Sequence, residues 1–111
     1  DAELVSEFVS EAKEHLENAD VNLLTLETSP RDTEALNTVF RAFHTIKGVA
    51  SFLSFAEIRS LAHEAEDLLA AARKGSVELS GPAIDVTFDA VDAMKRLIAS
   101  LGRALETGAV P

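Results

Sequence analysis

The sequence predicts an all-α protein, an antiparallel four-helix bundle. Apolar residues recur every three or four positions in four separate segments of the 111-residue chain, the spacing that gathers them on one face of a helix. No segment alternates between apolar and polar residues with a period of two, as a half-buried strand would. Because the loops between the four segments are short, we expect consecutive helices to run antiparallel around a shared core.

The first helix is predicted at about residues 2–27. Residues 1–27 carry eight acidic residues against one base, Lys13, and an acidic stripe of this kind is typical of a solvated helix face. Pro30, in the segment 29–32, ends the helix. The residues expected to face the core are Leu4, Phe8, Ala12, Leu16, Ala19, Leu23 and Leu26.

The second helix is predicted at about residues 33–50, with Asp32 or Thr33 as its N-cap. After a short turn at residues 51–54, a third helix is predicted at about residues 55–74. Lys74 and Gly75 are typical of its end, because a cation suits the last turn and glycine the position after it. The expected core positions of these two helices are Leu36, Val39, Phe43, Ile46, Ala50, Ile58, Leu61, Ala62, Ala65, Leu68, Leu69 and Ala72.

The fourth helix is predicted at about residues 82–106. Ser80 or Gly81 precedes it, and Pro82 suits the first helical position, where no backbone N–H is needed. A chain of this length forms a single core, so residues 1–111 are expected to be one domain. The apolar face of this helix consists of Ile84, Phe88, Val91, Met94, Ile98, Leu101 and Leu105.

Composition excludes several classes of function. The net charge of −9 argues against nucleic acid as a partner. The absence of cysteine excludes disulfides and thiolate metal sites, and we expect an intracellular, cytoplasmic location. No run approaches the roughly 20 apolar residues that a membrane-spanning helix needs. No signal-like leader is present either, so we expect a soluble domain without a membrane partner.

The second helix carries a histidine, His44, in an unusual setting. Its surface neighbours three and four positions away are Phe40, Arg41, Lys47 and Gly48. A glycine inside a helix costs roughly 1 kcal/mol relative to alanine. Gly48 therefore either lets another molecule approach His44 closely or lies near the helix end and helps to terminate it. The local sequence leaves both interpretations open.

A glutamate of the third helix, Glu66, matches His44 in its position relative to the core. Each lies roughly 110° from the centre of its own apolar stripe, with the same rotational sign. On antiparallel neighbours, such offsets either converge on the shared groove or both point away from it. Convergence would place the carboxylate against the imidazole, with His63, one turn before Glu66, on the same edge.

The chemistry open to these residues is limited. The di-metal sites of helical bundles take Glu-x-x-His pairs from two helices, which this chain lacks, so no metal site is expected. There is no nucleophile elbow and no phosphate-binding glycine-rich loop. What remains is an imidazole nitrogen that attacks a phosphoryl group while Glu66 holds the proton of the other nitrogen. Lys47 and Arg41 would offset the phosphoryl charge. The alternative is a surface histidine beside an incidental glycine and a solvated glutamate.

One segment carries a family signature. His44-Thr45-Ile46-Lys47-Gly48-Val49-Ala50 closely resembles the His-x-Ile/Leu-Lys-Gly-x-Ala/Ser motif of histidine phosphotransfer (HPt) domains of CheA-type chemotaxis histidine kinases. The preceding residues 36–42 and the third-helix residues 61–69 resemble that family too, so the likeness covers nearly the whole chain. It implies that His44 is phosphorylated, that Glu66 is its hydrogen-bonding partner and that His63 is the family's second histidine. Lys47 is then the motif lysine, and Gly48 the small residue that admits the partner.

The resemblance also implies a reaction partner at each end of the transfer. A separate ATP-binding kinase domain would phosphorylate His44, and a CheY-like response regulator, with Mg²⁺ bound to it, would take the group onto its own aspartate. This domain would bind no cofactor itself, and no autonomous catalysis is expected. Arg41 is expected at the partner interface. The alternatives are a helical module that only docks a regulator and a stand-alone phosphorelay carrier.

The turn after the motif departs from the family pattern. CheA relatives often read Gly-x-x-Gly-Phe there, whereas residues 51–55 of this chain read Ser-Phe-Leu-Ser-Phe. Serine enters left-handed backbone conformations less readily than glycine, so Ser51 and Ser54 are expected to change the turn. Phe52 and Leu53 are expected to be exposed near the docking face, where they would affect the choice of partner.

Overall fold

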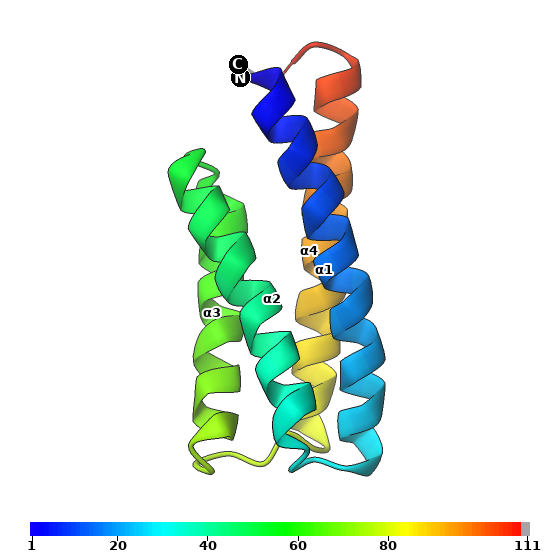
Figure 1. The fold of residues 1–111 in the computed structure, drawn as a ribbon, viewed down its shortest axis with the longest axis vertical. Coiled ribbons are helices and arrows are strands. Elements are labelled where there is room, and N and C mark those ends of the chain that lie inside the picture. Colours follow the sequence, from blue (N-terminus) through cyan, green and yellow to red (C-terminus); the bar gives the residue numbers. More distant parts are fainter. Residues whose placement is uncertain (110–111) are drawn as a thin grey trace.

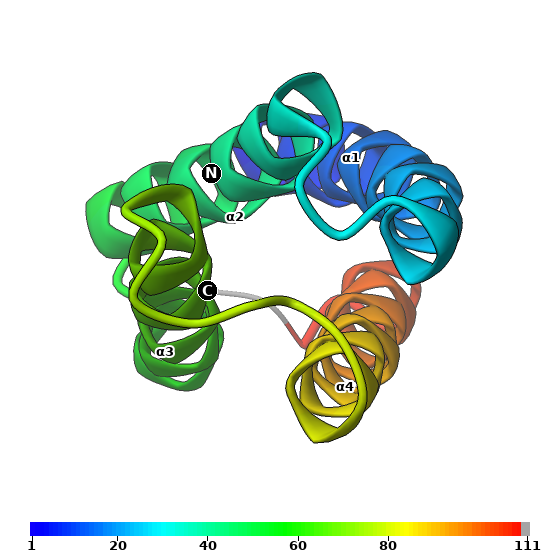
Figure 2. The same ribbon diagram turned by 90° about the horizontal axis from the view of Figure 1, so that it is seen from below.

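The computed structural model describes residues 1–109 and contains four helices, α1 (Ala2–Thr28), α2 (Thr33–Phe52), α3 (Ala56–Arg73) and α4 (Pro82–Glu106). The helices alternate in direction along the bundle (Figure 1). Seen from one end, they surround a common core in chain order, so that α4 returns to the side of α1 (Figure 2). The described residues contain no strand. The predicted all-α four-helix bundle is confirmed.

Local sequence explains where the helices begin. Asp32, rather than Thr33, caps α2, and its carboxylate accepts a hydrogen bond from the backbone N–H of Ala35 at 3.0 Å. The third helix is one residue shorter at each end than predicted, running from Ala56 to Arg73. Gly81 precedes α4, and Pro82 occupies its first turn, where a missing N–H leaves no hydrogen bond unmade.

The second helix continues past its predicted end at residue 50, to Phe52. The chain then turns at Ser54, whose φ of 65° is the only positive value at a non-glycine residue among those described. The N–H of Phe55 donates to the carbonyl of Ala50 at 2.8 Å, and the N–H of Ser54 to that of Ser51 at 3.2 Å. This pair of bonds is a Schellman motif. Serine thus adopts the left-handed conformation that glycine usually supplies.

The interpretation of Gly48 as a helix terminator is wrong. Gly48 lies inside α2, more than a turn before Phe52, and it is absent from the positive-φ glycines, which are Gly75, Gly81 and Gly108 among the described residues. The reason for a glycine at this position is therefore not the backbone conformation.

Most of the predicted core positions are buried, and the clearest difference is at the start of α1. Leu4 is 45% exposed, whereas Val5 is 2% exposed, because Val5 lies nearer the centre of the stripe that Phe8 and Ala12 continue. Several positions at the edges of the other stripes are half-buried instead of buried. These are Leu61, Leu68, Phe88, Leu101 and Leu105.

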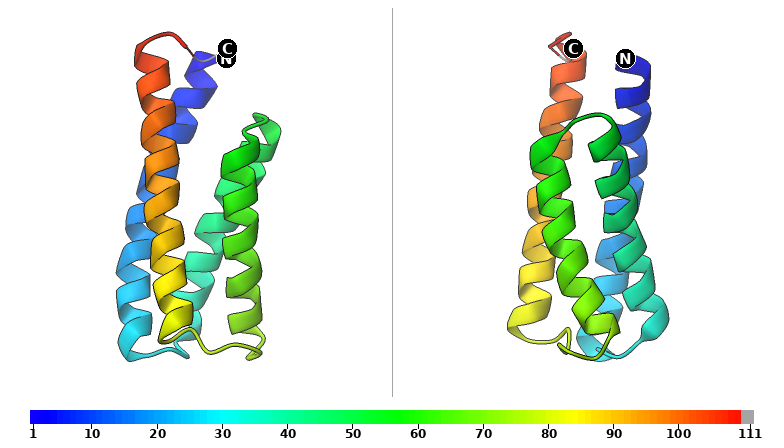
Figure 3. Two further views of the ribbon diagram at one scale, coloured as in Figure 1. Left: turned by 180° about the vertical axis from the view of Figure 1, so that it is seen from behind. Right: turned by 90° about the vertical axis from the view of Figure 1, so that its left-hand side faces the viewer.

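The helix lengths leave one end of the bundle uneven. The pair formed by α1 and α4 extends beyond the pair formed by α2 and α3, at the end that holds the N-terminus (Figure 3). No helix within residues 1–109 combines the length and the apolar character needed to cross a membrane.

Candidate functional site

His44 and Glu66 converge on the groove between α2 and α3. Nδ1 of His44 lies 2.6 Å from Oε2 of Glu66, and Nζ of Lys47 donates a hydrogen bond to Oε1 of the same carboxylate at 2.6 Å. Of the two arrangements that the helical offsets allow, the structure has the convergent one. It also pairs Lys47 with Glu66, a contact that the spacing of Lys47 from His44 did not predict.

The three side chains of this cluster differ in exposure. The side chain of Glu66 is 11% exposed, that of Lys47 is 25% exposed and that of His44 is 62% exposed. Burial alone would raise the pKa of Glu66, but the hydrogen bonds and charges of Lys47 and His44 outweigh it and lower that pKa below its ordinary value. Glu66 is therefore a carboxylate at neutral pH.

The ionised Glu66 determines which nitrogen of His44 carries the proton. A carboxylate can only accept hydrogen bonds, so Nδ1 of His44 must be the donor in the 2.6 Å contact. The neutral imidazole then has no proton on Nε2, whose lone pair lies on the side of the ring away from Glu66. The arrangement presents an oriented nitrogen nucleophile on an exposed ring.

Phe40 and Arg73 also belong to the site, although the sequence assigned neither residue to it. Phe40 contacts His44, and Arg73 contacts Phe40. Phe40 stacks on His44 with ring centroids 6.0 Å apart and an interplanar angle of 9°. The guanidinium carbon of Arg73, the last residue of α3, lies 4.2 Å from the centroid of the Phe40 ring. The i, i+4 spacing of Phe40 and His44 was a signal for the first contact. Nothing in the local sequence points to Arg73.

The surface next to His44 is open along α2. Gly48 is exposed one turn after His44, and a Cβ atom added to it would meet nothing within 4 Å. Arg41 is exposed on the same helix, three positions before His44. An incoming molecule can therefore approach the imidazole without first displacing a side chain at position 48.

Within residues 1–109, His63, Phe52 and Leu53 make no side-chain hydrogen bond or ion pair with His44 or Glu66. His63 is exposed, and its Nε2 lies 3.5 Å from Asp67 on its own helix, while Oε1 and Oε2 of Glu66 are taken by Lys47 and His44. Phe52 is 78% exposed, as expected. The expectation that Leu53 is exposed is wrong, because the chain reverses at this residue and its side chain packs half-buried against the core.

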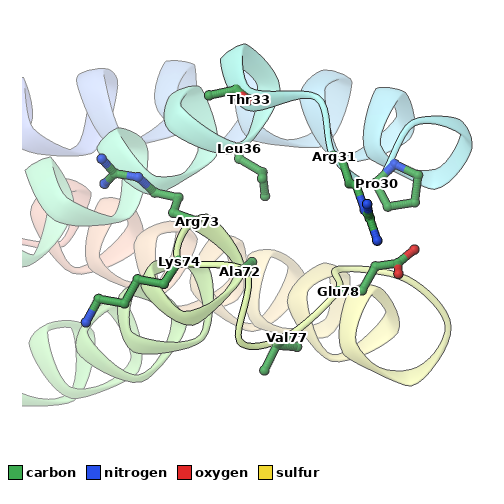
Figure 4. Close-up of a pocket in the computed structure, with 10 residues that line it drawn as sticks. Pro30, Arg31, Thr33, Leu36, Ala72, Arg73, Lys74, Val77 and Glu78 are labelled. Atoms are coloured by element: carbon green, nitrogen blue, oxygen red, sulfur yellow. The ribbon is translucent and has the colours of Figure 1, made fainter.

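A hollow of about 470 Å³ lies at the end of the bundle, between residues 30–36 and residues 72–78 (Figure 4). Arg73 borders it, but its side chain points toward α2 and away from Val77 and Glu78 (Figure 4). None of His44, Lys47 and Glu66 lines this hollow. The imidazole and its partners thus form a surface site, which suits a macromolecular partner better than an enclosed small molecule.

The sequence has relatives among curated proteins. Residues 3–107 match the family model described as "Hpt domain". The chain is 39% identical over 99 residues to the sensor histidine kinase CheAY of Helicobacter pylori, an alignment that covers 89% of this chain. The chain spans 12% of the length of that relative.

Solved structures share the fold. The CheA phosphotransferase domain from Thermotoga maritima superposes with a TM-score of 0.85 at 36% identity, covering 90% of this chain and 95% of that domain. The phosphorylated P1 domain of CheA3 from R. sphaeroides, solved in complex with CheY6, has a TM-score of 0.82 at 24% identity and covers 96% and 81%. Since the family match extends over nearly all of the four helices, the chain belongs to the Hpt domain family.

Proposed function

We propose that this chain is the phosphoryl-carrying domain of a chemotaxis-type histidine kinase. His44 accepts a phosphoryl group from ATP bound to a separate kinase domain and passes it to the aspartate of a CheY-like response regulator. The observation that carries this proposal is the 2.6 Å contact between Nδ1 of the exposed His44 and the buried Glu66. A module that only docks a regulator has no need of this contact. Because ATP is the phosphoryl source, the proposed location is the cytoplasm.

The first transfer uses the lone pair on Nε2 of His44. Nε2 attacks the γ-phosphorus, a P–N bond forms, and the bond to the oxygen that bridges the β- and γ-phosphorus breaks as ADP leaves with that electron pair. The imidazole becomes an N-phosphorylated imidazolium whose proton stays on Nδ1. Glu66 accepts the hydrogen bond from that proton and its negative charge stabilises the ring as positive charge develops.

The second transfer reverses these changes at His44. A carboxylate oxygen of the regulator attacks phosphorus, the P–N bond breaks, and the electron pair returns to Nε2. The partners supply the rest of the chemistry, because ATP is bound by the kinase domain and Mg²⁺ by the regulator. Arg41, Gly48 and Phe52 are exposed on α2, and they form the proposed contact surface for both partners.

Phosphorylation by a CheA-type kinase domain and labelled ATP tests the proposed function. The label on this chain should be lost in acid and stable in alkali, as expected for a P–N bond to histidine, and a CheY-like regulator with Mg²⁺ should remove it. ATP without the kinase domain should give no label, because in this proposal the kinase domain binds ATP and catalyses the transfer. A label that survives acid, or none after incubation with an active kinase, would contradict the proposal.

Two substitutions of Gly48 should distinguish its effect on the stability of the fold from its effect on access to His44. Gly48→Ala should raise stability by up to about 1 kcal/mol, because this helical position has space for a Cβ atom. Gly48→Gln should not lower the melting temperature, because glutamine is also a better helix former than glycine. It should slow transfer from the kinase and to the regulator, because its side chain would stand beside the imidazole. Ser10→Gln, at an exposed position of α1, serves as the control. A Gly48→Gln variant with unchanged transfer rates would refute the role in access.

A further inference from the structure

The stacking of Phe40 on His44 restricts the motion of the imidazole ring that the hydrogen bond to Glu66 still allows. The imidazole has two side-chain torsions, and the contact at Nδ1 holds one atom of the ring. The ring can still tilt about that atom. Phe40 lies nearly parallel to it, at an interplanar angle of 9°, and so restricts the tilt. Two independent contacts therefore determine the direction of the Nε2 lone pair.

Phe40 is itself held from the neighbouring helix. It is half-buried against the core, and the guanidinium carbon of Arg73 lies 4.2 Å from its ring centroid. Within residues 1–109 Arg73 forms no ion pair within 4.0 Å. Its position over Phe40 is therefore not the result of pairing with a nearby carboxylate. A planar guanidinium over an aromatic face is a favourable cation–π arrangement.

Residues of α3 thus contribute to both constraints on His44. Glu66 reaches Nδ1 directly, and Arg73, two turns further along α3, acts through Phe40. The Arg73 side chain points toward α2 instead of into the hollow that it borders (Figure 4). We propose that Phe40 and Arg73 are positioning residues that hold the imidazole plane of His44 for phosphoryl transfer. This inference rests on the proposed function.

Phe40→Leu and Arg73→Gln test the inference through the kinetics of phosphorylation by the kinase domain. An aromatic pair of this kind contributes enough to change a rate about two- to tenfold, so kcat should fall by that factor in each variant. KM for this chain should stay the same, because neither change blocks the approach to His44. Phe40→Tyr retains the ring and should restore kcat.

Phe88→Leu is the matched control for lost packing. Phe88 is also half-buried against the core, but on α4, so its replacement removes the same atoms without touching the stack. A fall in kcat equal to that of Phe40→Leu would overturn the inference, as would unchanged kcat in Phe40→Leu. A raised KM with unchanged kcat would also overturn it, because the two residues would then act in docking.

The ¹⁵N NMR spectrum of the His44 imidazole provides a readout that needs no kinase. All three proteins should show the form protonated at Nδ1, because Glu66 is unchanged. The ¹⁵N relaxation of the ring should report more motion of the His44 imidazole in Phe40→Leu and Arg73→Gln than in wild type, because the stack no longer restricts its tilt. Equal ring motion in all three proteins would overturn the inference. If wild-type chain takes no label from an active kinase, the proposed function fails instead, while the relaxation still reports whether the stack restricts the ring.

Discussion

Replacing His44 with glutamine should abolish phosphorylation by the kinase domain and leave the bundle folded. The amide nitrogen of glutamine has no free lone pair for attack at phosphorus, so no P–N bond can form. The fold should lose only about 1.5 kcal/mol, the low end for a hydrogen bond to a charged group, because the His44 side chain is 62% exposed and Glu66 keeps its contact with Lys47. Labelling with ATP and a thermal melt of the same sample measure both effects.

The other two histidines provide the matched controls for this substitution. His63 is exposed and paired with Asp67, and His15 is half-buried on α1. His63→Gln and His15→Gln should accept label at close to the wild-type rate. Label that persists in His44→Gln, or that disappears in either control at normal stability, would show that another residue is the acceptor.

Local sequence signals were sufficient for most of the fold. The fourth helix runs from Pro82 to Glu106, the bounds predicted from the proline at its start and the spacing of its apolar residues. The end of α2 could not be placed in the same way. The turn there depends on a serine, Ser54, in a left-handed conformation, which serine seldom adopts and which hydrogen bonds to Ala50 and Ser51 stabilise.

The site was only partly predictable. Helical periodicity places His44 and Glu66 on the flanks of their stripes, but it does not say on which side of α2 the third helix packs. That choice depends on the handedness of the whole bundle, and it decides whether the two side chains meet at 2.6 Å. The contact of Arg73 with Phe40 is likewise tertiary, because the two residues come from different helices and no motif links them.

Replacing Glu66 with alanine should slow phosphorylation of His44 by about a hundredfold, the low end of the range for a positioned acid–base partner. Without the carboxylate, Nδ1 of His44 loses its acceptor, so a larger share of the imidazole carries its proton on Nε2 and cannot attack. The positive charge that develops on the ring also loses its counter-charge. The fall should be in kcat, because Glu66 is buried and cannot contact the kinase domain directly.

Glu64→Ala is the control for the lost charge, because Glu64 is an exposed acid on the same helix. The kinase domain should phosphorylate this variant at the wild-type rate.

The stability of the chain in acid gives a second test of the role of Glu66. A lowered pKa means that the stabilisation by Glu66 is complete above its ordinary value of 4.5 and is lost as the pH falls from there through the lowered pKa. Glu66→Ala should therefore lose less stability than wild type over that acid interval. Equal kcat values for Glu66→Ala and wild type would show that the carboxylate does not orient His44.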